Sequence, residues 1–97
     1  METLTFSLLG LALPVLTVSN PEPVAHKNVI LLNCRVHPGE TNASYMCRGL
    51  MKFLTSNSKQ AKELLHKNII KIVPMLNPDG VVFGNFRTSI YVSIQIF

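Results

Sequence analysis

The chain has 97 residues, a length that suits one small domain. Its composition, 47% hydrophobic and 14% charged, excludes intrinsic disorder and is expected in part of a larger, core-rich domain. The formal charge of +4 comes from scattered lysines and arginines without an aromatic-interleaved patch, so no nucleic-acid binding is predicted. Two cysteines cannot form a disulfide framework and favour a reducing compartment.

The first apolar stretch, residues 4–18, is not expected to be a secretion signal or a membrane span. The residues before it, 1–3, contain a glutamate and no lysine or arginine. Gly10 and Pro14 interrupt the stretch, which is shorter than the roughly 20 residues that a span needs. We therefore predict a cytoplasmic protein without membrane association, and a strand over residues 11–18 whose proline lies near an edge or a bulge.

Residues 28–33 form a short apolar run, Asn-Val-Ile-Leu-Leu-Asn, which is typical of a strand covered on both faces. A helix should follow, with Thr41 or Asn42 as its N-cap. Apolar residues recur at helical spacing and predict its buried stripe, namely Met46, Leu50, Phe53 and Leu54.

A second, shorter helix is predicted after Asn57 and Ser58, and it should end at Lys67 or Asn68. Its inward-facing residues would be Ala61, Leu64 and Leu65. Residues 69–76 read as the next strand. Residues 29–76 therefore have the order strand, helix, strand, which predicts two parallel strands and an α/β fold with a mixed sheet.

A histidine and a glutamate three positions apart, His37 and Glu40, follow the first of these strands. An imidazole nitrogen and a carboxylate oxygen are ligands that zinc accepts. The spacing alone is weak, because each residue is usually a solvated loop side chain. Their position at the carboxyl end of a buried strand, where open α/β sheets place ligand sites, favours a metal site.

The residues Asn77-Pro78-Asp79-Gly80 have the composition of a turn. The turn should lie at the same sheet edge as His37. Asp79 could act there as a ligand or a base, but an Asx-type turn residue is the more usual role. Residues 90–97 alternate with a period of two, which predicts a further strand that is prone to aggregation.

Three motifs together resemble the cytosolic carboxypeptidases, which belong to the zinc metallocarboxypeptidases. They are Arg-Val-His-Pro-Gly-Glu-Thr-Asn at 35–42, Pro-Met-Leu-Asn-Pro-Asp-Gly-Val at 74–81 and Gly-Asn-Phe-Arg at 84–87. The resemblance runs from about residue 28 to residue 89, and more loosely over 11–20. It implies that the whole chain, 1–97, is the amino-terminal part of such a domain with a divergent tail at 90–97.

The resemblance also implies roles for individual residues. His37 and Glu40 would be two of three ligands of one zinc ion, and Arg87 would polarise the scissile carbonyl and stabilise the oxyanion. Residues 77–80 would shape the pocket floor. The reaction implied is hydrolysis of carboxy-terminal or branch-point glutamyl peptide bonds in proteins such as tubulin, the activity of a deglutamylase.

The departures from the family leave alternatives open. The family continues after Arg87 with an asparagine-arginine pair, a third ligand histidine and a general-base glutamate, none of which is matched here. His26 and His66 precede the two strands and should lie roughly 20 Å from His37, too far to replace that ligand. The chain is thus either a zinc-dependent enzyme or a non-catalytic splice product or fragment that acts at most as a binding module. The interpretation of the chain as a small phosphate-binding α/β domain has less support, because no glycine-rich loop follows either strand.

Overall fold

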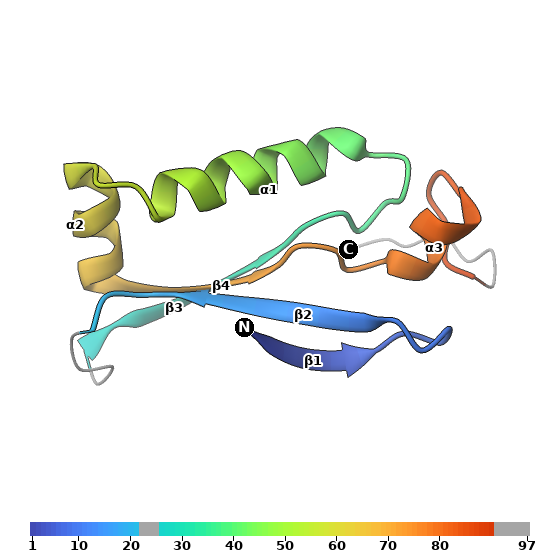
Figure 1. Cartoon of the computed structure of the whole chain (residues 1–97), viewed down its shortest axis with the longest axis horizontal. Helices are drawn as coiled ribbons and strands as arrows, with labels where there is room; N and C mark the ends of the chain where they lie inside the picture. Colours follow the sequence, from blue (N-terminus) through green and yellow to red (C-terminus); the bar gives the residue numbers. More distant parts are fainter. Residues whose placement is uncertain (22–25, 91–97) are drawn as a thin grey trace.

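The structure is a computed structural model that describes residues 1–21 and 26–90. The mixed sheet has the order β1-β2-β4-β3, with the helices arranged along it and at its ends (Figure 1). The elements are β1 (Glu2–Phe6), β2 (Ala12–Val18), β3 (Asn28–Asn33), α1 (Thr41–Leu54), α2 (Lys59–Lys67), β4 (Asn68–Val73) and α3 (Pro78–Phe83). The strand expected over residues 90–97 falls, from residue 91 onward, outside the described residues.

The amino-terminal strands form an antiparallel pair in which β2 agrees with the sequence and β1 was not predicted. All five residues of β1 are exposed, so it has no buried periodicity that could reveal a strand. Pro14 pairs with Thr3, and the register shifts between Thr3 and Thr5. The proline therefore lies opposite an irregularity in a strand that pairs with β1 and β4, rather than at the sheet edge.

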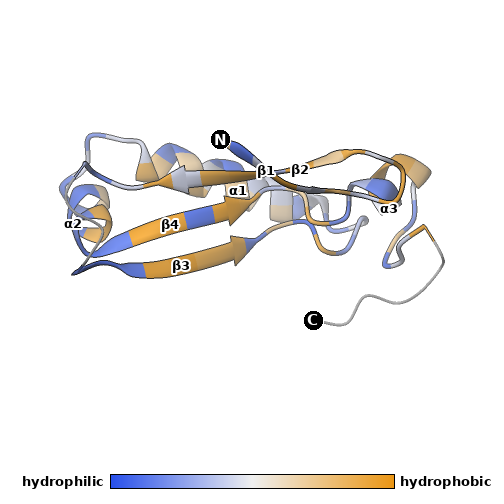
Figure 2. Ribbon diagram, turned by 90° about the horizontal axis from the view of Figure 1, so that it is seen from below, coloured by the Kyte–Doolittle hydropathy of each residue, from blue (hydrophilic) through white to orange (hydrophobic). Residues whose placement is uncertain are grey.

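The predicted parallel pair is present, with β3 and β4 matched from Asn28–Asn68 to Asn33–Val73. The expectation that both faces of β3 are covered is wrong. Within the described residues β3 pairs with β4 alone, and Val29 and Leu31 are 61% and 59% exposed. Figure 2 shows this apolar strand at one side of the sheet. Strand β4 ends at Val73, earlier than the predicted residue 76.

Helix α1 packs on the sheet through Cys47, Leu50 and Leu54 rather than through the whole predicted stripe. Met46 is 72% exposed and Phe53 is 41% exposed, because both lie on the flank of that face. The predicted N-cap is also wrong. Glu40 is the N-cap residue, Thr41 is already helical, and no side chain caps this end.

Helix α2 follows the prediction closely. Ser58 accepts a hydrogen bond from the amide of Ala61 as its N-cap, the helix ends at Lys67, and Ala61 and Leu65 are buried. The core between the helices and the sheet contains Cys47, Leu54, Leu65, Ile70 and Ile72. In the described part of the chain, no helix is both long enough and apolar enough to cross a membrane.

The predicted turn at residues 77–80 is instead the start of helix α3. Asn77 is its N-cap and accepts a hydrogen bond from the amide of Gly80, and Pro78 occupies the first turn. Asparagine followed by proline serves a helix start as well as a turn, which explains the error. Helix α3 lies at the end of the sheet where β3 and β4 finish (Figure 1).

Candidate metal centre

The turn that carries His37 continues the parallel ladder before it leaves the sheet. The amide of Cys34 donates to the carbonyl of Val73, and the amide of Leu76 donates to the carbonyl of Cys34, both at 2.9 Å. These bonds hold the segments after β3 and β4 side by side. The turn therefore starts from a fixed backbone at the carboxyl ends of the parallel strands, as predicted.

Two glycines allow the turn to approach the segment after α3. The amide of Gly39 donates to the carbonyl of Phe86 at 2.7 Å, and a Cβ on Gly39 would lie 2.1 Å from the Phe86 ring. A Cβ on Gly80 would lie 2.5 Å from both Pro38 Cγ and the carbonyl oxygen of Thr88. Any side chain at either glycine would overlap these neighbouring atoms, so the close approach requires glycine at both positions.

The segment after α3 folds back because Gly84, with φ of 73°, ends that helix in the left-handed region. The side chain of Asn77 donates to the carbonyl of Thr88 at 3.2 Å. The amide of Asn85 donates to the carbonyl of Gly80 at 2.9 Å. Arg87 lies inside this closed loop, next to the His37 turn.

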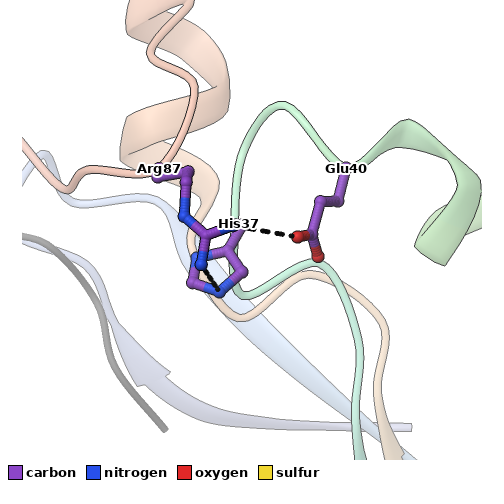
Figure 3. Close-up of polar contacts among 3 residues, drawn as sticks. All are labelled: His37, Glu40 and Arg87. Carbon is purple, nitrogen blue, oxygen red and sulfur yellow. Dashed lines mark hydrogen bonds and ion pairs between the residues drawn. The ribbon is translucent and has the colours of Figure 1, made fainter.

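The three residues singled out from the sequence, His37, Glu40 and Arg87, lie together (Figure 3). One guanidinium nitrogen of Arg87 is 3.3 Å from His37 Nε2, and the other is 3.7 Å from Glu40 Oε1. The Arg87 and Glu40 side chains are about half exposed, at 51% and 45%. The fold thus brings together side chains 50 positions apart on an open surface.

His37 and Glu40 fit two positions of a zinc site. Their donors are an imidazole nitrogen and a carboxylate oxygen, and His37 Nδ1 is buried without a hydrogen-bond partner. A buried, unpartnered ring nitrogen is unusual and suits a metal ion. Within residues 1–21 and 26–90, no group of three or more His, Cys, Asp and Glu side chains could hold a metal ion.

Asp79, the other candidate at this sheet edge, is not the turn-forming Asx residue, because Asn77 takes that part. Asp79 is 5% exposed in the first turn of α3. One oxygen accepts a hydrogen bond from the amide of Leu9 at 3.3 Å, and the other is buried without a partner. Asp79 therefore connects the β1–β2 loop to α3.

A pocket of about 520 Å³ adjoins the cluster between the end of β3 and α1. Its polar lining residues are Asn33, Arg35, His37 and Glu40. The other lining residues are apolar or thiols, namely Leu32, Cys34, Val36, Ala43, Met46, Cys47 and Leu50. Predominantly apolar walls with a few polar groups are typical of ligand sites.

The two cysteines in this pocket are free thiols. The pKa of the Cys34 thiol is raised from its ordinary 9.0 to about 11. Burial is the largest cause, and the hydrogen bond with Cys47 and the charge of Cys47 add to it. The thiol therefore stays protonated at neutral pH. Because the thiolate is the nucleophile, Cys34 should react slowly with alkylating reagents.

We expect iodoacetamide at pH 8.5 to alkylate native Cys34 at least about tenfold more slowly than the urea-unfolded chain, since each pKa unit changes the thiolate fraction about tenfold. The folded pKa lies above the unfolded one, so the stability that Cys34 contributes should be lost as pH rises from about 9 to about 11. Peptide mass spectrometry measures the first effect, and unfolding of the wild-type chain and Cys34→Ser measures the second. Equal alkylation rates of Cys34 in the native and the unfolded chain would contradict the raised pKa of its thiol.

The sequence pattern that defines the zinc carboxypeptidases matches residues 1–90. The chain belongs to the zinc carboxypeptidase family. Relatives of the chain include human cytosolic carboxypeptidase 2, 43% identical over 94 residues, and mouse cytosolic carboxypeptidase 6, 44% identical over 92 residues. These matches cover 93% and 92% of this chain but only 10% and 17% of the two relatives.

Among solved structures, the metallo-carboxypeptidase from Burkholderia cenocepacia superposes on the chain with a TM-score of 0.88 and 31% sequence identity. The match covers 96% of this chain and 26% of that one. The predicted resemblance to cytosolic carboxypeptidases and the predicted mixed-sheet carboxypeptidase fold are confirmed. The chain spans a small part of the length of its curated relatives.

The groups that support the cluster were not predicted from the sequence. Arg35 donates hydrogen bonds to Pro38 and Ser44, and the Phe86 carbonyl accepts one from Gly39. Arg35 directly precedes Val36-His37, but nothing in its spacing indicates a structural bond. The Phe86 contact uses a backbone carbonyl and has no sequence signal.

Proposed function

We propose that this chain contributes two zinc ligands, His37 and Glu40, and a charge-stabilising arginine, Arg87, to a carboxypeptidase site. The proposal rests mainly on the convergence of these three side chains from two segments 50 residues apart. Zinc held there would supply Lewis acidity. Membership of the zinc carboxypeptidase family supports the choice of metal. Residues 1–97 would then be one part of the catalytic domain.

Arg87 would act on the substrate rather than on the metal. A guanidinium donates several hydrogen bonds and accepts none, so it suits a carbonyl oxygen that gains negative charge. Its loop is closed by the Asn77–Thr88 and Asn85–Gly80 hydrogen bonds, which orient the side chain in advance. The half-exposed guanidinium remains accessible to a peptide.

The substrate class we propose is a protein tail with carboxy-terminal or branch-point glutamates, such as that of tubulin, in the cytoplasm. The similarity to proteins named cytosolic carboxypeptidases supports a peptide substrate. The formal charge of +4 favours an acidic one.

The second candidate function is that of a non-catalytic binding fragment. It is favoured by the two metal donors found in the described residues, because catalytic zinc sites use three protein ligands and an open position. Release of glutamate from a peptide would separate the two functions. Release that Glu40→Gln abolishes would establish the enzyme, whereas binding without release would favour the fragment.

We expect the zinc-loaded chain to bind a peptide ending in several glutamates more tightly than the matched glutamine peptide. Arg87→Gln should weaken binding of the glutamate peptide by about three- to tenfold, since it removes a charge-assisted hydrogen-bond donor. Fluorescence anisotropy with labelled peptides is the measurement, and Arg48→Gln on the exposed face of α1 is the charge-matched control. Equal affinities for both peptides would exclude the proposed substrate class.

A further inference from the structure

Arg35 has an unusual backbone conformation just before the metal-binding turn. Its φ of 53° is in the left-handed region, and it is the one non-glycine residue with positive φ among residues 1–21 and 26–90. An arginine at such a position costs conformational energy that glycine or asparagine would avoid. Non-glycine residues in this region cluster at sites where the geometry serves a function.

The side chain of Arg35 bridges the two sides of the candidate ligand pair. Its Nε donates to the carbonyl of Pro38 at 2.8 Å, and a terminal nitrogen donates to Ser44 Oγ at 2.9 Å. Pro38 lies between His37 and Glu40, and Ser44 is in the first turn of α1. Both bonds are partly buried, and both are charge-assisted, which makes them stronger than neutral ones.

The two bonds act on the parts of the turn that decide where its donors point. The bond to the Pro38 carbonyl fixes the Pro38–Gly39 peptide plane between His37 and Glu40, and the bond to Ser44 fixes the start of α1 relative to Glu40, its N-cap residue. No side chain caps this end of the helix, so the Arg35–Ser44 bond is a side-chain tie between the turn and α1. Guanidinium groups have no lone pair for a metal, so Arg35 itself is not a ligand.

We propose that Arg35 is a positioning residue that holds His37 and Glu40 in the one turn geometry in which both donors reach a single cation. The left-handed backbone directs the arginine side chain back over its own turn. The planar guanidinium then fastens the turn to α1, a geometry that a lysine could not reproduce with one ammonium group. This inference rests on the proposed zinc-binding function.

The test compares Arg35→Gly, Ser44→Ala and the charge-matched control Arg48→Ala in the full chain. Glycine keeps the left-handed backbone without strain, so Arg35→Gly should fold as well as the wild type. We expect Arg35→Gly to weaken zinc binding, measured by calorimetry, about tenfold or more, as removal of groups that orient metal ligands does. Ser44→Ala should have a smaller effect in the same direction, and Arg48→Ala should have none.

Thermal unfolding without zinc separates positioning from general stability. An unchanged midpoint with about tenfold weaker zinc binding in Arg35→Gly supports the proposal, whereas unchanged zinc affinity overturns it. Amide hydrogen exchange of the metal-free chain is an independent readout. The Gly39 and Glu40 amides should exchange about tenfold faster in Arg35→Gly, and equal rates would overturn the proposal even if the wild-type chain bound no zinc. Failure of the zinc function itself would appear differently, as wild-type binding that His37→Ala does not change.

Discussion

Replacing Gly80 by alanine is expected to lower the free energy of unfolding by about 3 kcal/mol, the upper end of the usual cost of overpacking. A Cβ at Gly80 would lie 2.5 Å from the Thr88 carbonyl oxygen and 2.5 Å from Pro38 Cγ. The first neighbour is backbone and the second belongs to the turn that carries His37, so neither can move without opening the contact between α3, this turn and the Arg87 loop. Urea unfolding followed by circular dichroism measures the change.

Gly49→Ala is the matched control, because it makes the same substitution in helix α1. A Cβ at Gly49 would meet no atom within 4 Å. Alanine is a better helix former than glycine by about 1 kcal/mol, so this variant should be more stable than the wild type. Equal changes in stability for the two variants would show that the close approach at Gly80 does not hold the site together.

His37→Ala is expected to weaken zinc binding by about a hundredfold or more, since removing groups that merely orient a ligand already costs ten- to a hundredfold. Wild-type binding should itself be looser than at a closed four-ligand site, because the described residues gather two donors. Affinity should rise with pH, since zinc displaces protons from imidazole and carboxylate ligands. Isothermal titration at two pH values measures both effects.

His26→Ala is the control for that experiment. His26 is exposed and precedes β3, at the opposite end of the strand from His37. We expect its substitution to leave zinc affinity unchanged. Tight binding that survives His37→Ala, or that disappears in His26→Ala, would show that zinc binds elsewhere on the chain.

Most of the strand-helix-strand unit could be predicted because its periodicity reflects local burial. The run at residues 28–33 and the helical spacing of Leu50 and Leu54 correspond to β3 and α1. The errors lie where burial depends on neighbours that the pattern does not contain. Val29 and Met46 are apolar but exposed, because one is in a strand at the side of the sheet and the other is on the flank of its helix.

The candidate site was predictable as a set of residues and not as a geometry. His37 and Glu40 follow from a local motif, whereas their proximity to Arg87 depends on a backbone contact between Gly39 and Phe86. That contact requires helix α3, although the sequence predicted a turn there. It also requires the left-handed conformation of Gly84, which reverses the chain after α3. Loop contacts of this kind are set by backbone conformation, which residue spacing does not encode.

X-ray absorption at the zinc edge of the zinc-loaded chain tests most directly whether His37 and Glu40 hold the metal. The main alternative is the thiol pair Cys34 and Cys47, which lines the adjoining pocket and would be a softer donor set. We predict a first shell of nitrogen and oxygen at about 2.0–2.2 Å with an imidazole signature that His37→Ala removes. A sulfur shell at about 2.3 Å, unchanged in His37→Ala, would contradict the assignment.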